Sequence, residues 1–526
     1  MHRFFIVNRV DKAKFVMGAV AIWVALWLWW TRHYQLDDAF IHLKYAGFLW
    51  SRGFLTFDGV HRNHGTSSLL YVGLAASIYG FVKSAYVPKA LSILSYLGLL
   101  MMVSRRVWRS QQAARVVWAS VLVVLISPMA FRWLCDGMET SMAVLGSAVM
   151  GRVAYSISVR PTHSRRQYIW LFLLAAATVM LRIELCSLVA VATAAALLLR
   201  AERAAPTAGE HPTPGEVVHW VLRESHLAMG GCLAVLITYF WAGHLLPDTA
   251  VAKALGRVDI AQLWGVARAF SASFSLGIGL LLIWAICLVV AFRADAIRRN
   301  HLCSLLVANS VLPLMVTATV VRGQYVHGVR YFLWPLMFMI VWDVLLVFSP
   351  APAWEQHAIP LARLRPRRRI AVTASLILLA CVWGVEGRVV RRITADASQV
   401  YLEMRSDHLD ALVGKPGMAF DVGLISYFSR AQVCDLSGLV NGRALAQAAP
   451  EERARYCVAQ APTFAFVTPA QAVSLRSLID FDSWVLCRKY WLSNVAVREP
   501  HYLLVRPDVA REFTDPYLPK GKAELR

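Results

Sequence analysis

The chain has 526 residues, of which 58% are hydrophobic and 16% charged, whereas soluble domains average about 45–50% apolar and about 25% charged residues. This composition excludes a disordered, collagen-like or coiled-coil chain and predicts a protein that crosses a membrane several times. The formal net charge is +22, and a large positive charge is typical of nucleic-acid-binding proteins. Here the basic residues cluster between apolar runs, which indicates membrane topology and not a nucleic-acid partner.

The apolar residues gather in runs that we predict to be membrane-spanning helices. The run 168–199 would be about 48 Å long as one helix, at ~1.5 Å per residue, against a hydrocarbon core of ~30 Å. It carries Arg182 and Glu184 near its middle, and burying both charges in lipid would cost several kcal/mol. We therefore predict two short helices joined at 182–184, and about eleven spans in total, from the runs 15–30, 87–104, 116–133, 139–157, 168–199, 226–243, 272–292, 303–320, 328–348 and 370–386.

The segment 68–82 is the main ambiguity of this topology. If it spans the membrane, the basic stretch 105–109 falls on the side opposite the basic N-terminus. If it lies on the membrane surface, every basic cluster between helices falls on one face, which is then cytoplasmic. We therefore predict a surface helix at 68–82, within a long first outer loop at 31–86, and an N-terminal anchor whose end is cytoplasmic.

The last 140 residues have a different pattern. Short apolar stretches at 418–422, 432–436, 463–467 and 502–505 alternate with polar segments, which predicts a small α/β domain. We divide the chain into a transmembrane domain at 1–387 and an α/β domain at 388–526, which an odd number of spans places in the periplasm. We expect Cys434, Cys457 and Cys487 to stay unpaired, with a disulfide between two of them as the alternative in an oxidising space.

Polar residues of unusual kinds gather on the predicted non-cytoplasmic side. A channel or transporter more often has its polar groups near mid-bilayer, so this one-sided set indicates chemistry at the membrane surface. The candidate site residues are Asp37, Asp38, His64, Glu139, Arg182, Glu184, Lys253, Gln324, His327 and Arg330.

Each candidate also has a structural interpretation. The adjacent carboxylates Asp37 and Asp38 could be a solvated helix-end pair. Alternatively, one takes a proton from an acceptor hydroxyl while the other orients a cation or a sugar hydroxyl. Lys253 and Arg330 are either cations at the membrane interface or a clamp for a phosphate. His61 and His64 have a spacing that suits a metal, but no third ligand is evident, so a metal site stays undetermined.

Several short motifs occur in an order that is similar to the GT-C glycosyltransferases, which take a sugar from a polyprenyl phosphate at the outer membrane face. Among these, the chain resembles most the family containing the terminal arabinofuranosyltransferases of mycobacterial cell walls. The motifs are Asp37-Asp38-Ala39-Phe40-Ile41, Gly65-Thr66-Ser67, Gly137-Met138-Glu139-Thr140, Arg182-x-Glu184, Leu246-Pro247-Asp248-Thr249 with Lys253, Gly328-x-Arg330-Tyr331-Phe332, Gly423-Leu424-Ile425-Ser426-Tyr427-Phe428 and Asp435-Leu436-Ser437-Gly438-Leu439-Val440.

The resemblance implies a GT-C fold whose first outer loop holds two surface helices, with Asp37 and Asp38 as the catalytic centre. It implies a lipid-phosphate donor, with arabinofuranose as the leading sugar, and no nucleotide. The donor phosphate would lie near Lys253, Arg330 and Arg182, while Glu139 and Glu184 hold sugar hydroxyls. His64, Gln324 and His327 are further substrate-binding candidates, and a divalent cation is an open cofactor.

We therefore expect a glycosyltransferase of the bacterial inner membrane that acts on a cell-envelope glycan or protein. The sequence departs from the resembled family in the stretch His61 to His64, in Arg322-Gly323-Gln324 and at Asp248, so donor and acceptor need not be those of the mycobacterial enzymes. Two alternatives are a non-catalytic envelope or localisation protein of the same fold and a transporter of lipid-linked sugars.

Overall fold

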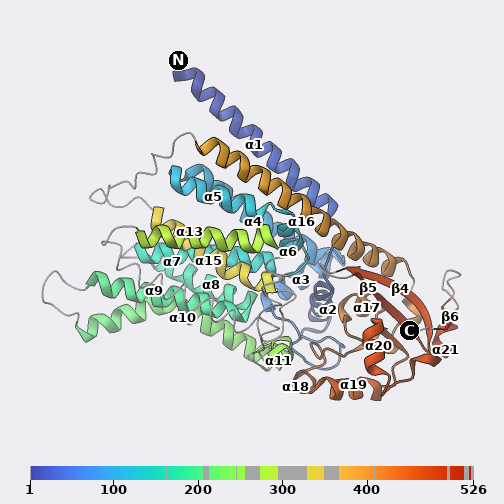
Figure 1. The fold of residues 1–526 in the computed structure, drawn as a ribbon. Coiled ribbons are helices and arrows are strands. Elements are labelled where there is room, and N and C mark those ends of the chain that lie inside the picture. The colour runs from blue at the N-terminus through green and yellow to red at the C-terminus, as the bar shows by residue number, and fades with distance from the viewer. Residues whose placement is uncertain are drawn as a thin grey trace.

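The computed structural model describes residues 2–159, 164–204, 213–244, 246–254, 273–293, 328–348, 367–407, 409–493, 498–513 and 521–522. Long helices form one part of the molecule, and a six-stranded sheet with short helices forms the other (Figure 1). The helix α16 (Arg367–Ser406) runs from the helical part to the sheet domain without a break. The predicted domain boundary at 387/388 therefore falls inside a helix.

The helical part contains most of the apolar runs. Its helices include α1 (His2–Trp30), α2 (Asp37–Arg52), α3 (Leu69–Val82), α4 (Val87–Arg109), α5 (Gln112–Leu125), α6 (Pro128–Leu134), α7 (Thr140–Val159), α8 (Arg165–Leu181), α9 (Cys186–Ala204), α10 (Pro214–Ala242), α11 (Asp248–Ala254), α13 (Gly279–Arg293) and α15 (Gly328–Phe348). Glycine lets pairs of these helices approach closely. A Cβ atom on Gly151 of α7 would collide with the Phe338 carbonyl of α15, and one on Gly230 of α10 with the Phe172 carbonyl of α8.

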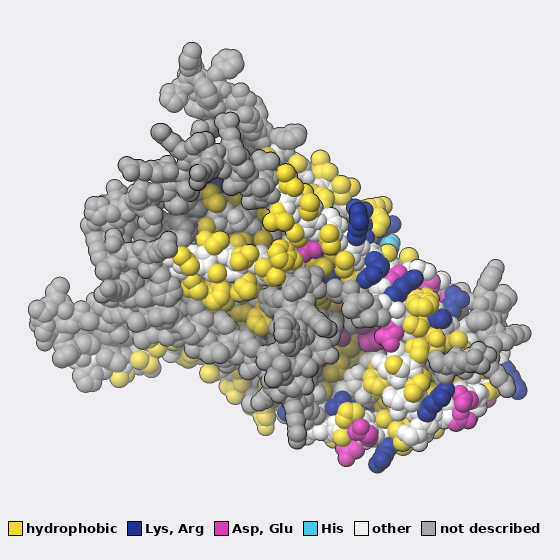
Figure 2. Space-filling view, in the orientation of Figure 1, with side chains coloured by type: hydrophobic (Ala, Val, Ile, Leu, Met, Phe, Trp, Pro, Cys, Tyr) yellow, Lys and Arg dark blue, Asp and Glu magenta, His cyan; other side chains and the backbone are white. Residues whose placement is uncertain are grey.

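Two described helices are long and apolar enough to cross a membrane, Val87–Arg109 and the Ser225–Ala242 part of α10, with α5 and α6 as a third span if that bent pair is counted as one. Hydrophobic side chains cover much of the described surface of the helical part, whereas charged side chains gather on the sheet domain (Figure 2). Eleven spans and the orientation of the termini stay predictions, and the run 303–320 lies outside the described residues.

Two of the apolar runs are each divided into two helices in the structure. In the run 168–199, α8 ends at Leu181 and a short 3-10 turn, Ile183–Leu185, precedes α9, so the break predicted at 182–184 is confirmed. The prediction of one helix over 116–133 is wrong, because α5 and α6 meet at an angle of 70°. Pro128 disfavours helical geometry in the residue before it, and the Ser127 side chain accepts the Ala130 N–H to start a new helix.

The first outer loop holds α2 and α3, which pack against each other. The predicted helix at 68–82 is confirmed as α3, which has 14 residues. Ser68 begins it by accepting the Tyr71 N–H. Apolar side chains of α3 that include Leu74, Ile78 and Phe81 stay exposed, as a helix lying on a membrane surface requires.

The C-terminal domain is α/β, as predicted. Its sheet has the order β2-β1-β3-β5-β4-β6, in which β1 pairs in parallel with β2 and β3, and β5 pairs antiparallel with β3 and β4. Its elements include β1 (Pro416–Ala419), α17 (Val422–Ser429), β2 (Gln432–Asp435), α18 (Arg443–Gln447), α19 (Pro450–Ala459), β3 (Phe464–Val467), α20 (Pro469–Leu475), β4 (Val485–Ser493), β5 (Arg498–Val505), α21 (Pro507–Ala510) and β6 (Gly521–Lys522). The prediction missed β4.

Candidate functional site

The predicted acidic pair lies where the two parts of the molecule meet. Asp37 and Asp38 form the first turn of α2, where carboxylates are stabilised by the positive end of the helix dipole. The helix packs against α17 of the C-terminal domain. Neighbouring side chains on a helix point in different directions, and these two carboxylates accordingly bind different partners.

Asp37 joins α2 to the C-terminal domain. Its carboxylate accepts the N–H groups of Gly423 (2.8 Å) and Leu424 (2.7 Å) at the start of α17. The N-cap residue of α17, Asp421, makes no capping hydrogen bond of its own, so Asp37 caps this helix from another domain. Burial, and then the charge of Asp421, raise the pKa of Asp37 well above its usual value, against the effect of the two N–H groups.

Asp38 binds an arginine of the helical part instead. Its Oδ2 atom lies 3.3 Å from Nη2 of Arg330, which belongs to the first turn of α15. The Asp38 side chain is 35% exposed, whereas the Arg330 side chain is only 3% exposed. Of the two carboxylates, Asp38 therefore combines access for a substrate with a cation directly behind it.

A second buried ion pair lies beside Arg330. Arg182, between α8 and α9, binds Glu139 at 3.0 Å and Glu184 at 3.1 Å. The Tyr331 ring links the two arginines, because its centre lies 4.8 Å from Cζ of Arg182 and 5.3 Å from Cζ of Arg330. The structure thus brings together five of the predicted residues: Asp38, Glu139, Arg182, Glu184 and Arg330.

His42 is a member of this network that the sequence analysis missed. Its Nε2 atom lies 3.2 Å from Glu139, and Nδ1 lies 2.9 Å from the hydroxyl oxygen of Thr66. Burial alone would raise the pKa of Glu139, but the hydrogen bond from His42 and the charge of Arg182 bring it below its usual value, so this carboxylate is ionised. A sequence signal existed, since His42 lies one helical turn after Asp38.

His64 lies in a different contact region. Its N–H donates to the Asp248 carboxylate (3.1 Å), and its carbonyl accepts the Asp248 N–H (2.7 Å). Arg443 of the C-terminal domain lies 3.6 Å from the same carboxylate. Burial lowers the pKa of the His64 ring to about 4, so it is neutral at pH 7. The residue joins the outer loop to α11 and to the C-terminal domain.

Three further candidates have no described side chain. Lys253 lies in α11, whose backbone is described, while Gln324 and His327 lie outside the described residues. Within the part of the chain that the structure describes, no group of three or more His, Cys, Asp or Glu residues is arranged to hold a metal ion. His61, considered with His64 as a metal ligand, pairs with Asp58 at 2.7 Å on the surface.

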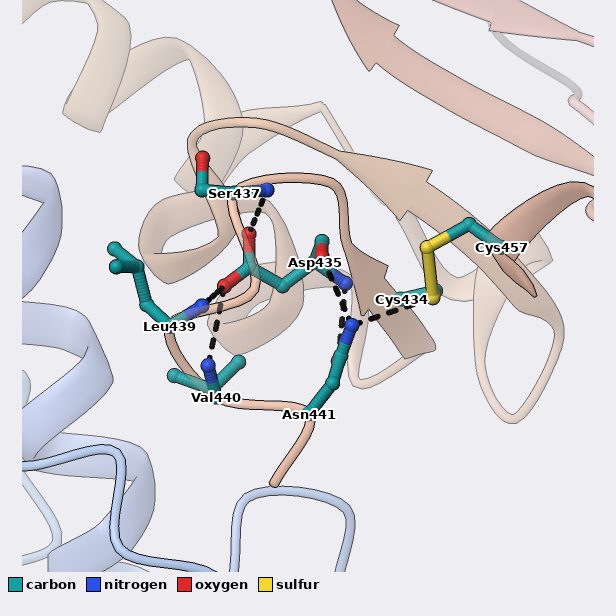
Figure 3. Close-up of a disulfide and its surroundings, with 7 residues drawn as sticks. All are labelled: Cys434, Asp435, Ser437, Leu439, Val440, Asn441 and Cys457. Carbon is teal, nitrogen blue, oxygen red and sulfur yellow. Dashed lines mark hydrogen bonds between the residues drawn. A yellow bond between two sulfur atoms is a disulfide. The ribbon is translucent and has the colours of Figure 1, made fainter. Parts of the chain in front are cut away.

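A disulfide anchors the loop through which the C-terminal domain contacts the outer loop (Figure 3). It joins Cys434 of β2 to Cys457 of α19, so the expectation of unpaired cysteines is wrong for these two. Asp435 organises the loop by accepting the N–H groups of Ser437, Leu439 and Val440. The Val440 carbonyl in turn accepts a hydrogen bond from the Asn63 side chain of the outer loop (2.9 Å).

Glycine makes this contact possible. A Cβ atom on Gly65 would collide with the Tyr45 hydroxyl and with the Leu439 carbonyl, and one on Gly423 would collide with the Asp37 carbonyl. Both residues belong to motifs that the sequence analysis singled out. Their role in the structure is close backbone packing between the outer loop or α2 and the C-terminal domain.

Comparison with known proteins supports the fold. A family model described as a domain of unknown function (DUF8728) matches residues 397–517, and no curated protein matches the sequence. A crystal structure of ArnT from Cupriavidus metallidurans bound to undecaprenyl phosphate is similar over 94% of this chain and 99% of that one, with a TM-score of 0.50 and 10% sequence identity. The apo form of that ArnT aligns with a TM-score of 0.38 and 13% identity. The likeness to the lipid-bound structure shows a common fold that spans nearly the whole of both chains.

Proposed function

We propose that this protein is a GT-C glycosyltransferase that transfers a sugar, with arabinofuranose as the first candidate, from a polyprenyl phosphate to an envelope glycan or protein. The observation that carries the proposal is the pairing of the half-exposed Asp38 carboxylate with the buried Arg330. A partly exposed carboxylate suited to act as a base thus lies beside a buried cation suited to bind a phosphate. The fold shared with ArnT, solved with undecaprenyl phosphate, and the motifs similar to GT-C enzymes support it.

In the proposed reaction, Asp38 takes the proton from the acceptor hydroxyl as that oxygen bonds to the anomeric carbon of the donor sugar. The bond between the sugar and the phosphate oxygen breaks, and the phosphate leaves on its lipid with the bonding electrons. Arg330 stabilises the negative charge that develops on the phosphate, and its buried position strengthens the interaction. Glu139 and Glu184 are the candidates for binding sugar hydroxyls.

The two aspartates have separate roles in this proposal. Both oxygens of Asp37 accept backbone N–H groups of α17, which leaves this side chain poorly placed to accept a proton. Asp37 therefore positions α2 against the C-terminal domain, and Asp38 is the base. The same contact holds the C-terminal domain where an acceptor would approach the site.

The disulfide supports the proposed compartment of the C-terminal domain. Disulfides such as Cys434–Cys457 persist in oxidising compartments and are rare in the cytosol. This bond supports a periplasmic C-terminal domain; the bacterial inner membrane and a cytoplasmic N-terminus belong to the proposal through the predicted topology alone.

The test uses the full-length protein in liposomes with radiolabelled polyprenyl-phosphate arabinofuranose and crude envelope acceptors. We expect label to move to an acceptor with wild type and not with Asp38→Asn, and the labelled species names the acceptor. If only another polyprenyl-phosphate sugar is transferred, arabinofuranose is wrong but the enzyme class stands. Movement of the donor across the bilayer without transfer would identify a transporter. If no donor moves across the bilayer and no sugar is transferred, the result would support a non-catalytic protein.

A further inference from the structure

In the proposed function Arg330 holds the donor phosphate, and both Arg330 and a second buried arginine, Arg132, have guanidinium nitrogens without a partner among the described residues. Arg330 uses Nη2 for Asp38, while its Nε and Nη1 have no hydrogen-bond partner among the described residues. Arg132 of α6 is 5% exposed, and its Nε and Nη1 likewise lack a partner there. A buried charged donor without an acceptor is costly, so these four nitrogen atoms indicate an anionic ligand.

A short chain of contacts brings the two arginines to one region. The Leu36 N–H donates to the Asp136 carbonyl (2.9 Å), and the Lys89 ammonium donates to the Tyr34 carbonyl (2.9 Å) and to the Cys135 carbonyl. These bonds hold the turn that follows α6 against residues 34–38, where Asp38 binds Arg330. Burial raises the pKa of Tyr34 to about 12, and the charges of Arg132 and Arg330 both oppose that rise.

The other buried cations of this region already have acceptors. Arg182 binds two carboxylates, Glu139 and Glu184, and Lys89 binds two carbonyl groups. Arg132 lies near the Tyr34 hydroxyl and the Asp136 carboxyl, but its Nε and Nη1 donate to neither of them within the described residues. Burial raises the pKa of Asp136 to about 7, so this carboxyl is an incomplete counter-ion at neutral pH.

From these contacts we infer that Arg132 is the second phosphate-binding group of the site. The phosphodiester of the donor binds between the Arg132 and Arg330 guanidinium groups, the polyprenyl monophosphate that leaves binds there too, and Arg182 stays with its two carboxylates. The inference rests on the proposed function and revises its phosphate clamp, which the sequence analysis had assigned to Lys253, Arg330 and Arg182. Two guanidinium forks offer several directed N–H donors to the phosphate oxygens.

The test measures equilibrium binding to the full-length protein in nanodiscs, with three probes: decaprenyl monophosphate, decaprenol and inorganic phosphate. We expect Arg132→Gln to weaken decaprenyl monophosphate binding at least tenfold and to leave decaprenol binding unchanged, with Arg132→Lys in between. If Arg132→Gln also weakens the binding of inorganic phosphate tenfold, the site recognises the phosphate itself. If only the lipid phosphate does, recognition requires the lipid.

Arg453→Gln is the matched control, because Arg453 is a buried arginine of the C-terminal domain whose donors are already used by the Ala448 and Ser437 carbonyls. We expect it to lower the unfolding temperature and to change lipid-phosphate affinity less than twofold. If Arg132→Gln binds decaprenyl monophosphate as tightly as wild type does, the inference is wrong. If Arg132→Gln does not fold, Arg132→Lys replaces it, and wild-type affinity for decaprenyl monophosphate in Arg132→Lys would equally show that the inference is wrong. If Arg132→Gln still transfers sugar at the wild-type rate, the inference about Arg132 is wrong and the proposed function stands. If lipid-phosphate binding depends on Arg132 but the wild-type protein transfers no sugar, only the proposed function is wrong.

Discussion

Two polar regions of this protein lie close together and differ in how completely their hydrogen bonds are made. Where the outer loop and α2 meet the C-terminal domain, Asp37, Asn63 and Asp435 all find backbone partners. Around Arg330 and Arg132, buried donors lack acceptors among the described residues. The backbone contacts of the first region hold the fold together, although His64 Nδ1 and Asp248 Oδ1 have no hydrogen bond there, and the unpaired buried cations of the second region indicate a ligand site. Substitutions at the contact with the C-terminal domain should therefore change the stability of the protein, and substitutions around Arg330 and Arg132 should change its activity.

The largest effect is expected at Arg330. Arg330→Gln removes the cation that stabilises the leaving phosphate and the partner of Asp38, so turnover should fall about 10²–10³-fold, the usual loss for one preorganised group of this kind. Arg330→Lys should retain part of the rate. The measurement is the steady-state rate of sugar transfer, with the unfolding temperature as the control. A small loss of rate in Arg330→Gln would place the phosphate elsewhere.

The disulfide should give the largest change in stability. Cys434 and Cys457 are 23 residues apart in the sequence, and closing a loop of that order contributes about 3 kcal/mol to the free energy of unfolding. Replacing both cysteines by serine should remove that contribution and loosen the loop that contacts Asn63. Cys487→Ser is the control, since Cys487 is a buried free cysteine of the same domain. Equal stability of the double variant and wild type would refute this role.

A smaller loss of stability is expected at Gly423. A Cβ atom there would collide with the Asp37 carbonyl, so Gly423→Ala should push α17 away from α2 and cost about 1–3 kcal/mol. Gly384, a helical glycine with open space around the Cβ position, serves as the control through Gly384→Ala. Thermal unfolding measures both. If the two variants unfold alike, Asp37 does not hold α17 as closely as we describe.

Near neutral pH the smallest effect is that of His64 protonation, and it grows as the pH falls. Burial lowers the pKa of His64 from 6.5 to about 4, so the unfolded chain binds more protons than the folded one between these values. The folded state should therefore lose stability as the pH falls from about 6.5 to about 4. The unfolding temperature should depend less on pH over this range in His64→Gln. An unchanged pH dependence in the variant would show that the ring does not titrate as an isolated buried group.

Much of the fold could be predicted because it depends on local composition. Two charges inside the run 168–199 predicted the break before α9, and the placement of the basic clusters together with the short length of 68–82 predicted α3. The break at Ser127-Pro128 was also readable from the sequence, but hydropathy alone reports an apolar run and not the missing N–H of proline. The strand β4 was missed because its residues Arg488 and Lys489 interrupt the apolar pattern.

The site was predictable only in part, for a different reason. Residue types placed Asp38, Glu139, Arg182 and Arg330 on one face. The different roles of Asp37 and Asp38 depend on the N–H groups of Gly423 and Leu424, which lie 386 and 387 residues further along the chain. No local sequence pattern contains that information. The sequence analysis did not consider Arg132, a single basic residue in an apolar run, because its unpaired donors are visible only in the packing of α6.

The central claim is that two neighbouring aspartates have different duties, one structural and one catalytic. The most direct test measures turnover per folded molecule and the unfolding temperature of Asp37→Asn and Asp38→Asn side by side. We predict that Asp38→Asn lowers turnover per folded molecule by about 10³-fold, within the usual range for a general base, beyond any loss of stability from leaving the buried Arg330 without its carboxylate. Asp37→Asn should lose about 1–2 kcal/mol of stability, as for a lost helix cap, and keep most of its turnover. Loss of turnover in Asp37→Asn with full activity in Asp38→Asn would contradict the account.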